Sequence, residues 1–415
     1  MNNWKKCKLG DAPLEFIDGD RGKNYPKQNE FYSNEYCLFL STKNVRENGF
    51  DFSECQFITK EKDEILKKGK LKINDLVLTT RGTIGNLALY KENIPYKNTR
   101  INSGMLIIRP NNKELDSRYA FYLFKNLKDE FDNFVSGSAQ PQLPIRDLKE
   151  VEILLPPLEE QRQIADILSS IDDKIELLHE QNKTLEELAQ TLFRRYFIEN
   201  PNPSWQNIKL GDLVEETIGG EWGKENPIED FKVPTYCFRG ADIADLITGL
   251  PKKIPLRYIK KAKLEKIEPK SGDILLEISG GTETQSTGRT IYIDDNIKKL
   301  FNYPIVFSNF CRLLRVKKIE YSYYLFFYLK YLYGNDEFFA FENGSSGIKN
   351  LDYKTLLNNT DCLKPDDEIF SFHKKVVLYF NKINKNKQQI QTLENMRDIL
   401  IPKLLNGEIK VGGNQ

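Results

Sequence analysis

The stretch LLPPLEEQRQIADILSSIDDKIELLHEQNKTLEELAQTLFRRYF, residues 154–197, decides how this chain folds. Its two prolines end any preceding element, and no Gly or Pro follows them, so the sequence predicts one long uninterrupted helix. Apolar side chains recur along it in steps of four and three, from Ile164 to Tyr196. This period fits a coiled-coil strand, although a helix packed on a globular core can show the same pattern.

A second copy of the pattern favours the coiled coil. The same register recurs 208 residues later, and Pro157 then matches Pro365. The chain therefore contains one internal repeat, each copy about half its length. The matched seam positions are Ile164, Leu168, Ile171, Ile175, Leu178, Asn182, Leu185, Ala189, Leu192 and Tyr196, and then Phe372, Val376, Tyr379, Ile383, Asn386, Ile390, Leu393, Arg397, Leu400 and Leu404.

The two seams can pair with each other in an antiparallel arrangement. If Asn182 faces Asn386, every other seam position also faces a seam position, with Ile164 opposite Leu404 and Tyr196 opposite Phe372. We therefore predict a contact between the two asparagines that fixes the register, because an unmatched buried amide costs about 1–3 kcal/mol. The alternative is that both amides reach water at a loosely packed crossing.

Composition excludes several classes of protein. The 415 residues carry a formal net charge of +1, which argues against a generic polyanion binder. Six scattered cysteines without CxxC spacing predict reduced thiols, and the only histidines, His179 and His373, lie on the predicted long helices. A zinc or histidine-based site is therefore not expected. No apolar run suggests a signal peptide or a membrane span, so we expect a soluble, cytoplasmic protein.

Each half of the chain opens with W-x-x-x-K-L-G-D, at Trp4 and at Trp205. Both halves then show hairpin patterns with polar, Gly-containing tips at 70–90 and 267–293, and aromatic-rich helices at 117–133 and 321–341. The predicted fold class is α+β, two mixed globules and two long helices. The expected boundaries are a first globular domain at 1–157, a helix at 158–200, a second domain at 201–362, a helix at 363–409 and a tail at 410–415.

The sequence lacks the motifs of self-sufficient enzymes. The sequence has no G-x-G-x-x-G, G-x-x-x-x-G-K-[ST], H-E-x-x-H or G-x-S-x-G, and no N/D-P-P-Y/F tetrapeptide. The pair Asp172 and Asp173 is expected on a solvated helix face rather than in a catalytic site. An enzyme acting alone is disfavoured.

The residues that carry a family likeness are the segment 154–178, the helix end LENMRDILIPKLLNGEIKV at 393–411, and the two repeated openings. Together they resemble the specificity subunit of type I restriction-modification systems over nearly the whole chain. The second helix start departs from the family pattern, because residues 364–369 lack the Glu-Gln pair formed by Glu160 and Gln161. The two helix starts are therefore not expected to make identical contacts with a partner.

The resemblance implies a non-catalytic reader of double-stranded DNA. In this family two target-recognition domains each bind one half of an interrupted, asymmetric site, and an antiparallel helix pair with pseudo-twofold symmetry separates them and docks other subunits. The implied partners are two modification subunits that use S-adenosylmethionine and two restriction subunits that use ATP and Mg. No cofactor or metal is expected on this chain, and no membrane contact.

Base edges are read by Arg, Lys, Asn and Gln, while Ser, Thr and backbone amides bind phosphates. Applied to the predicted loops of the first domain, this rule selects Lys43, Arg81, Thr83, Arg100, Asn102, Ser138, Gln140 and Gln142. In the second domain it selects Arg239, Thr284, Gln285, Arg289, Asn309, Ser345, Lys349 and Asn350. Arg81 and Arg289 are the strongest candidates, since each is a basic residue among glycines. The alternative for each residue is an ordinary solvated loop position.

Three other functions compete with the interpretation of the chain as a DNA-specificity subunit. A self-contained nuclease lacks its motif, and a purely structural scaffold leaves two large, divergent domains unexplained. A specificity component of a solitary or single-chain methylation or restriction system remains open. The loops RGTIGN and SGGTETQSTGR differ in length and chemistry, which predicts that the two half-sites differ.

Overall fold

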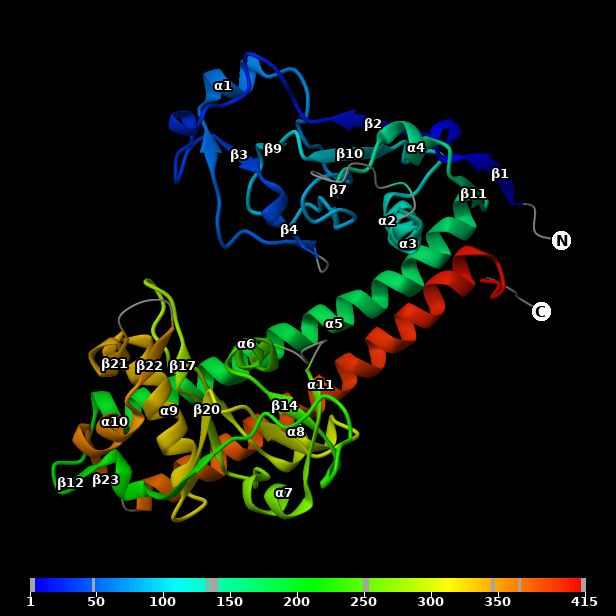
Figure 1. Cartoon of the computed structure of the whole chain (residues 1–415). Coiled ribbons are helices and arrows are strands. Elements are labelled where there is room, and N and C mark those ends of the chain that lie inside the picture. The colour runs from blue at the N-terminus through cyan, green and yellow to red at the C-terminus, as the bar shows by residue number, and fades with distance from the viewer. Residues whose placement is uncertain are drawn as a thin grey trace. The chain divides into compact units, whose positions relative to one another are not determined.

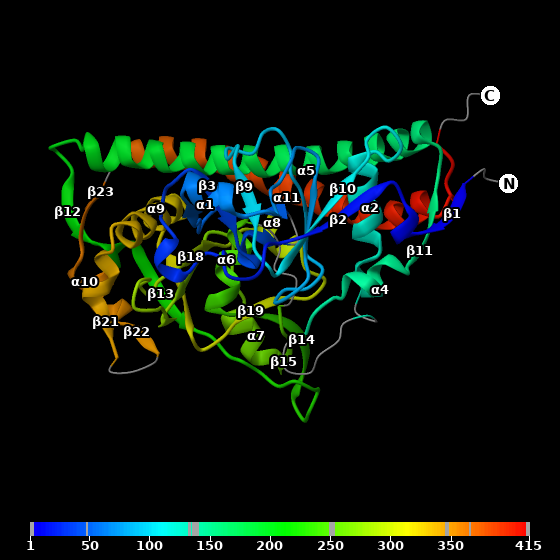
Figure 2. The ribbon, with the colours of Figure 1, turned by 90° about the horizontal axis from the view of Figure 1, so that it is seen from above.

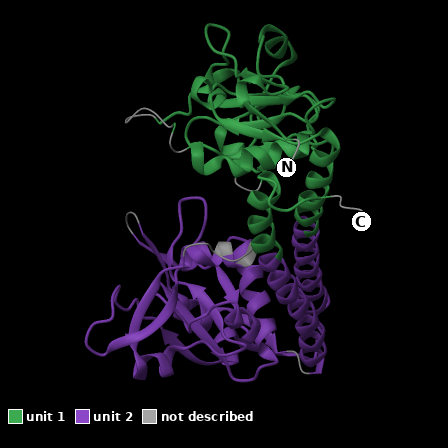
Figure 3. Ribbon diagram, turned by 90° about the vertical axis from the view of Figure 1, so that its right-hand side faces the viewer, with its two compact units in different colours: residues 1–174, 393–415 green, residues 175–392 purple. Residues whose placement is uncertain are grey.

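The computed structural model describes residues 4–46, 49–131, 134, 141–248, 254–344, 348–364 and 367–411. The chain forms two compact units (Figure 3). Unit 1 contains residues 1–174 and 393–415, and unit 2 contains residues 175–392. Each unit therefore holds one globular domain together with a part of each long helix.

The two long helices are α5, Leu158–Phe193, and α11, Asp367–Leu405, which lie side by side (Figures 1 and 2). A π-helical turn, Arg194–Glu199, extends α5. The second helix begins later than the predicted boundary at 363 because a strand reaches Lys364. Among the helices of the described residues, none is long and apolar enough to cross a membrane.

The predicted antiparallel seam forms in both units. In unit 1, Ile164 and Leu168 pack in one buried cluster with Leu404. In unit 2, Ala189 packs in another cluster with Phe372 and Val376. The N-terminal part of α5 thus pairs with the C-terminal part of α11, and the opposite ends pair likewise.

The predicted asparagine contact is present inside unit 2. Asn386 is fully buried, and its Nδ2 donates hydrogen bonds to Asn182 Oδ1 and to Gln181 Oε1, each at 2.8 Å. A buried amide with this partner specifies one register, because a slip by one heptad would leave it unpaired. The hydrogen bond therefore selects one of the registers that the repeated apolar period would otherwise allow.

The register predicts a double-mutant result. Asn386→Leu should lower the free energy of unfolding by about 1–3 kcal/mol, because the partly buried Asn182 loses its hydrogen-bond donor. Adding Asn182→Leu should restore most of that loss, since two apolar side chains then face each other. Urea unfolding of the three variants and the parent measures the coupling. Strictly additive losses would contradict the contact.

The expectation for Asp172 was wrong. Its carboxylate accepts hydrogen bonds from Arg397 at 2.8 Å and from the Tyr122 hydroxyl at 2.7 Å, all within unit 1. Burial and the neighbouring Asp172 charge raise the pKa of Tyr122. Asp172 is thus a link between the domain and the helices, whereas Asp173 is exposed as expected.

The first domain is built on two small sheets. The first is antiparallel in the order β2 (Leu14–Asp18), β10 (Met105–Pro110), β7 (Leu76–Thr79) and β8 (Leu87–Leu89). The second contains β6 (Phe57–Ile58), β3 (Cys37–Leu40) and β9 (Thr99–Ile101), with β3 and β9 parallel. The remaining elements are β1 (Lys5–Lys8) with β11 (Glu152–Leu155), β4 (Val45–Arg46) with β5 (Gly49–Phe50), α1 (Lys60–Ile65), α2 (Ser117–Asn126), α3 (Lys128–Phe131) and α4 (Ile145–Lys149).

The second domain repeats this plan. Its four-stranded sheet has the order β13 (Val214–Gly219), β20 (Cys311–Val316), β16 (Ile274–Glu277) and β18 (Thr290–Tyr292). One three-stranded sheet contains β15 (Leu256–Lys260), β14 (Phe231–Phe238) and β19 (Ile305–Phe307), again with one parallel pair, and β17 (Ser279–Gly280), β22 (Lys349–Leu351) and β21 (Glu342–Asn343) form another. The remaining elements are β12 (Gln206–Lys209) with β23 (Asp361–Lys364), α6 (Gly240–Thr248), α7 (Lys261–Ile267), α8 (Asp295–Lys299), α9 (Tyr321–Gly334) and α10 (Tyr353–Asn359). The internal repeat and the α+β class are thereby confirmed.

The apolar runs of the central strands explain where the polar loops lie. Leu76 and Leu78 on β7 pack toward α2, while Val77 packs toward Leu38 and Leu40 on the other face. A strand covered on both faces needs a continuous apolar run, and its polar residues are confined to its ends. Thr79 in β7 and Glu277 in β16 are these end residues, and the candidate site begins there.

Candidate nucleic-acid interface

The two domains can be aligned through backbone hydrogen bonds at the ends of β7 and β16. The Thr79 amide donates to the Asn86 carbonyl at 2.9 Å, and the Glu277 amide donates to the Arg289 carbonyl at 2.9 Å. Thr79 therefore corresponds to Glu277, and Asn86 corresponds to Arg289. A neutral pair in the first domain is replaced by a charged pair in the second.

The next residue of each strand extends the correspondence. The Thr80 amide donates to the Gly104 carbonyl at 2.9 Å, and the Ile278 amide donates to the Phe310 carbonyl at 2.8 Å. Gly104 in the first domain thus corresponds to Phe310 in the second. This replacement changes the surface of the second domain, because the Phe310 side chain is 54% exposed whereas glycine has no side chain.

One residue further on, each strand end meets a distant loop. Arg81 forms an antiparallel bridge with Gln142, and Ser279 pairs in the same way with Asn350. The matching amides of Leu143 and Leu351 bond to the carbonyls preceding Arg81 and Ser279, at 3.0 and 2.9 Å. Candidate residues far apart in sequence are therefore brought together at the same place in both domains.

In the first domain this place carries an arginine beside an amide. Arg81 Nη2 donates to Gln142 Oε1 at 3.2 Å, while Gln142 and Thr83 are exposed. Gly82 lies in the turn after Arg81 with φ of +70°, a backbone conformation that glycine adopts without strain. Lys43 is also exposed and lies 3.9 Å from Glu54. These groups can donate to guanine or phosphate and can bond adenine.

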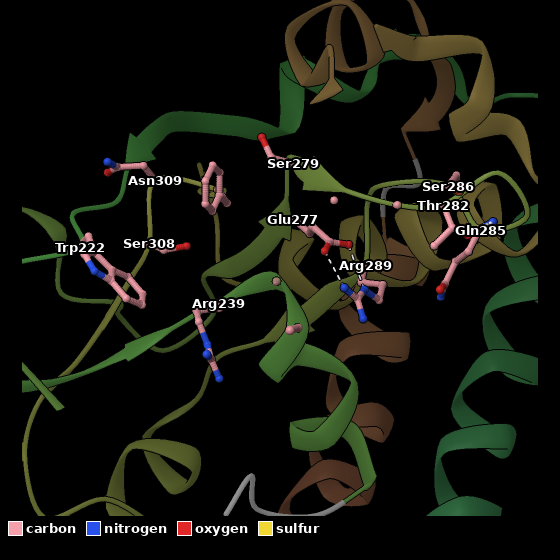
Figure 4. Close-up of a pocket in the computed structure, with 15 residues that line it drawn as sticks. Trp222, Arg239, Glu277, Ser279, Thr282, Gln285, Ser286, Arg289, Ser308 and Asn309 are labelled. Carbon is pink, nitrogen blue, oxygen red and sulfur yellow. Dashed lines mark hydrogen bonds and ion pairs between the residues drawn. The ribbon is translucent and has the colours of Figure 1, made fainter. Parts of the chain in front are cut away.

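In the second domain the corresponding place is a recess of about 740 Å³ (Figure 4). Arg289 binds Glu277 with two hydrogen bonds, Nε to Oε2 at 2.9 Å and Nη2 to Oε1 at 2.6 Å. The hydrogen bonds that Arg289 donates to Glu277 raise the pKa of Arg289. Glu277 is only 2% exposed, and a Cβ added at Gly240 or Gly280 would come within 2.4 or 2.6 Å of its Oε1. The Glu277 carboxylate is therefore held in one position, and its two hydrogen bonds hold the Arg289 side chain in place.

Four of the predicted second-domain residues line this recess: Arg239, Gln285, Arg289 and Asn309. The Arg239 guanidinium also binds Asp242, at 2.7 and 3.0 Å, and Gln285 Nε2 donates to the Tyr333 hydroxyl at 3.2 Å.

The other described candidates of this domain do not line the recess. Asn350 contacts Ser279, Lys349 binds Glu342 at 3.0 Å, and Thr284 is exposed beside Thr282.

One first-domain expectation needs correction. Arg100 lies on β9 rather than in a loop, is 5% exposed, and binds the carboxylate of Asp63. Its side chain stabilises the fold and is not presented to a ligand. Asn102 lies in the loop after β9, as predicted; its Oδ1 accepts the Gly104 amide at 2.9 Å, and its contact with DNA stays a prediction. Ser138, Gln140 and Ser345 lie outside the described residues.

The recess residues that sequence reasoning missed include Trp222, Glu277, Ser279, Ser308 and Phe310. Ser279 could have been found by matching the end of β16 to Arg81 in the first repeat. Phe310 follows the selected Asn309 directly, but the rule used for base and phosphate contacts selected only polar and basic side chains. Trp222 and Ser308 carried no local signal, because only the fold brings them to Glu277.

Comparison with known proteins gives the family. The family model described as "Type I restriction modification DNA specificity domain" matches twice, at residues 1–187 and 202–395. The chain belongs to this family. The two matches follow the internal repeat, and the DNA-specificity role of the family applies to this chain.

Two relatives illustrate the extent of the similarity. The type I restriction enzyme MjaIX specificity subunit of Methanocaldococcus jannaschii is 27% identical over 84% of this chain and 81% of its own length. The type I restriction enzyme HindI specificity subunit of Haemophilus influenzae is 22% identical over 99% of this chain and all of its own length. The crystal structure of a type I restriction-modification S subunit from M. genitalium matches the fold with a TM-score of 0.56 at 18% identity, covering 97% of this chain and 96% of that chain.

Proposed function

We propose that each target-recognition domain reads one half of a bipartite, asymmetric DNA site. The observation that carries this proposal is the set of corresponding positions with different chemistry. Arg81 and Gln142 in the first domain correspond to Ser279 and Asn350 in the second. Two domains that share a backbone plan but differ at its polar edge are suited to different base sequences.

The chemistry of each edge suggests what it recognises. Arginine binds the O6 and N7 acceptors of guanine, and glutamine or asparagine binds adenine through N6 and N7. Arg81 and Gln142 therefore suit a half-site containing guanine or adenine. Exposed threonines and lysines such as Thr83 and Lys43 suit phosphates, which position the duplex without reading it.

We further propose that the chain is non-catalytic and acts in the cytoplasm within a larger complex. Its helices act as a spacer and as the docking site for two modification subunits, which two restriction subunits join. S-adenosylmethionine, ATP and Mg are used by those partners. The support is family membership together with the continuity of α5 and α11 from one unit into the other.

The methylation pattern tests the proposal as a whole. Sequencing of methylated adenines in cells that express this chain with its modification subunit should reveal one interrupted motif with two different halves. An uninterrupted or palindromic motif would exclude two different readers. The experiment also supplies the duplex needed for binding measurements.

A substitution tests the first reader. Arg81→Ala should weaken binding to the specific duplex by about 1–3 kcal/mol, because a bidentate base contact is lost. Lys6→Ala removes the same charge at an exposed position paired with Glu152 and serves as the control. Binding is measured by fluorescence anisotropy at fixed salt, and assembly with the modification subunit by gel filtration. Loss of assembly would place the Arg81 loop in a subunit interface instead.

A further inference from the structure

The recess of the second domain combines a buried polar floor with an exposed rim. Glu277 and Ser308 are each 2% exposed, whereas Phe310 is 54% exposed. In Figure 4, Trp222 and Ser308 lie on one side of the recess, and Glu277 with Arg289 lies in the middle. A ligand must therefore enter the recess to meet its polar groups.

This geometry is a poor match for a base that stays stacked in a duplex. The major groove is about 12 Å wide and 8.5 Å deep, so side chains that read it must project from the protein surface. Arg289 does not project, because Glu277 holds it and its side chain is only 24% exposed. The rim of the recess would meet the phosphate backbone before the arginine met a base edge.

The groups in the recess suit a flat, polar, aromatic ligand. The Trp222 ring is held by the Arg257 guanidinium, whose central carbon lies 4.3 Å from the ring centroid. Phe310 supplies a second, exposed ring, and aromatic rings stack on nucleobases with a gain of about 1–3 kcal/mol. A volume of about 740 Å³ is within the usual range of small-ligand sites, about 300–1,000 Å³.

Two polar groups are available for hydrogen bonds to such a ligand. Glu277 occupies two of the five N–H donors of Arg289, so further donors remain on the guanidinium. The Ser308 hydroxyl is buried and has no oxygen or nitrogen hydrogen-bond partner among the described residues. Unpaired buried polar groups are costly, and a ligand with acceptors would satisfy this one.

We propose that this recess binds one nucleobase that leaves the DNA stack when the second domain engages its half-site. The inference rests on the proposed function. Phe310 and Trp222 contact the base, Arg289 and Ser308 bond its polar edge, and Glu277 is a positioning residue for Arg289. The first domain has Gly104, Asn86 and Thr79 at the positions of Phe310, Arg289 and Glu277, so at these positions it lacks the groups proposed to hold the base.

A mismatch scan of the second half-site tests this. Each base is kept while its partner is changed, and affinity is measured for the full chain assembled with its modification subunits. A mismatch lowers the cost of extruding a base, so at one position binding should strengthen by roughly tenfold, while other mismatches weaken it. Phe310→Ala and Ser308→Ala should abolish the strengthening. Tyr303→Ala removes an exposed ring outside the recess and should preserve it.

The outcomes separate this inference from the proposed function. If every mismatch weakens binding, the bases stay stacked and the inference fails, although specific binding of the matched duplex still supports the DNA reader. If one mismatch strengthens binding equally in the parent and in both recess variants, the base enters another site, and the inference also fails. Absence of specific binding to the matched duplex would overturn the proposed function itself.

Discussion

Arg100→Ala should be the most destabilising single substitution in the first domain, with a loss of about 3–5 kcal/mol, because it leaves the buried Asp63 with Lys70 alone and frees the carbonyls that Arg100 binds. The guanidinium binds the Asp63 carboxylate and donates to three carbonyls, those of Asp63 at 2.7 Å, Leu66 at 2.8 Å and Lys68 at 2.6 Å. These bonds fasten the end of α1 and the following loop to β9. Removal of one side chain therefore frees four acceptors at once.

Urea unfolding followed by hydrogen exchange in peptides of unit 1 measures the loss. Arg146→Ala is the matched control, because its side chain is 89% exposed and its pairing with Asp147 is a surface contact. Surface pairs contribute about 0–1 kcal/mol, so the control should stay close to the parent. If Arg100→Ala keeps the stability of the parent but loses DNA binding, the assignment of Arg100 to the interior is wrong.

The same ion pair gives the domain a defined response to acid. Burial raises the pKa of Asp63, but the hydrogen bonds from Lys70 and Arg100 outweigh that effect and hold it below its ordinary value. A depressed carboxyl pKa contributes stability above the ordinary value near 4, and the contribution is lost as pH falls through the lower folded-state pKa. Arg100→Ala should accordingly flatten the acid-induced loss of stability of unit 1.

Arg100 also shows where sequence reasoning stops. The residues of the helix seam could be predicted individually. The apolar period and the positions of Asn182 and Asn386 can be read directly from the sequence, and one antiparallel alignment brings the two asparagines together. Arg100 is buried because it pairs with Asp63, which lies 37 residues earlier in the chain. No local sequence pattern predicts that pair. Likewise, the correspondence of Arg81 with Ser279 became visible only through backbone hydrogen bonds. The spacing of apolar residues predicts helices and strands, whereas polar pairs between residues far apart in the sequence can be identified only from the folded structure.

Insertion of one heptad into each long helix should lengthen the DNA spacer that the protein tolerates. The insertions belong between Ile175 and Leu178 in α5 and between Ile390 and Leu393 in α11, where each helix passes from one unit to the other. Seven residues add about 10.5 Å of helix at 1.5 Å per residue. That length corresponds to about three base pairs at 3.4 Å each, so the spacer should grow by about three while both half-sites keep their bases.

Pairing of the inserted heptads with each other is what makes this test specific. The seam stays in phase, and Asn182 still meets Asn386, because residues on either side of the insertions move together. An insertion into α5 alone is the control: it shifts every seam pair on one side by two turns and should abolish assembly of the complex. Methylome sequencing reads the spacer directly. If the doubly extended protein assembles and methylates with the parental spacer, the helices do not set the distance between the two readers.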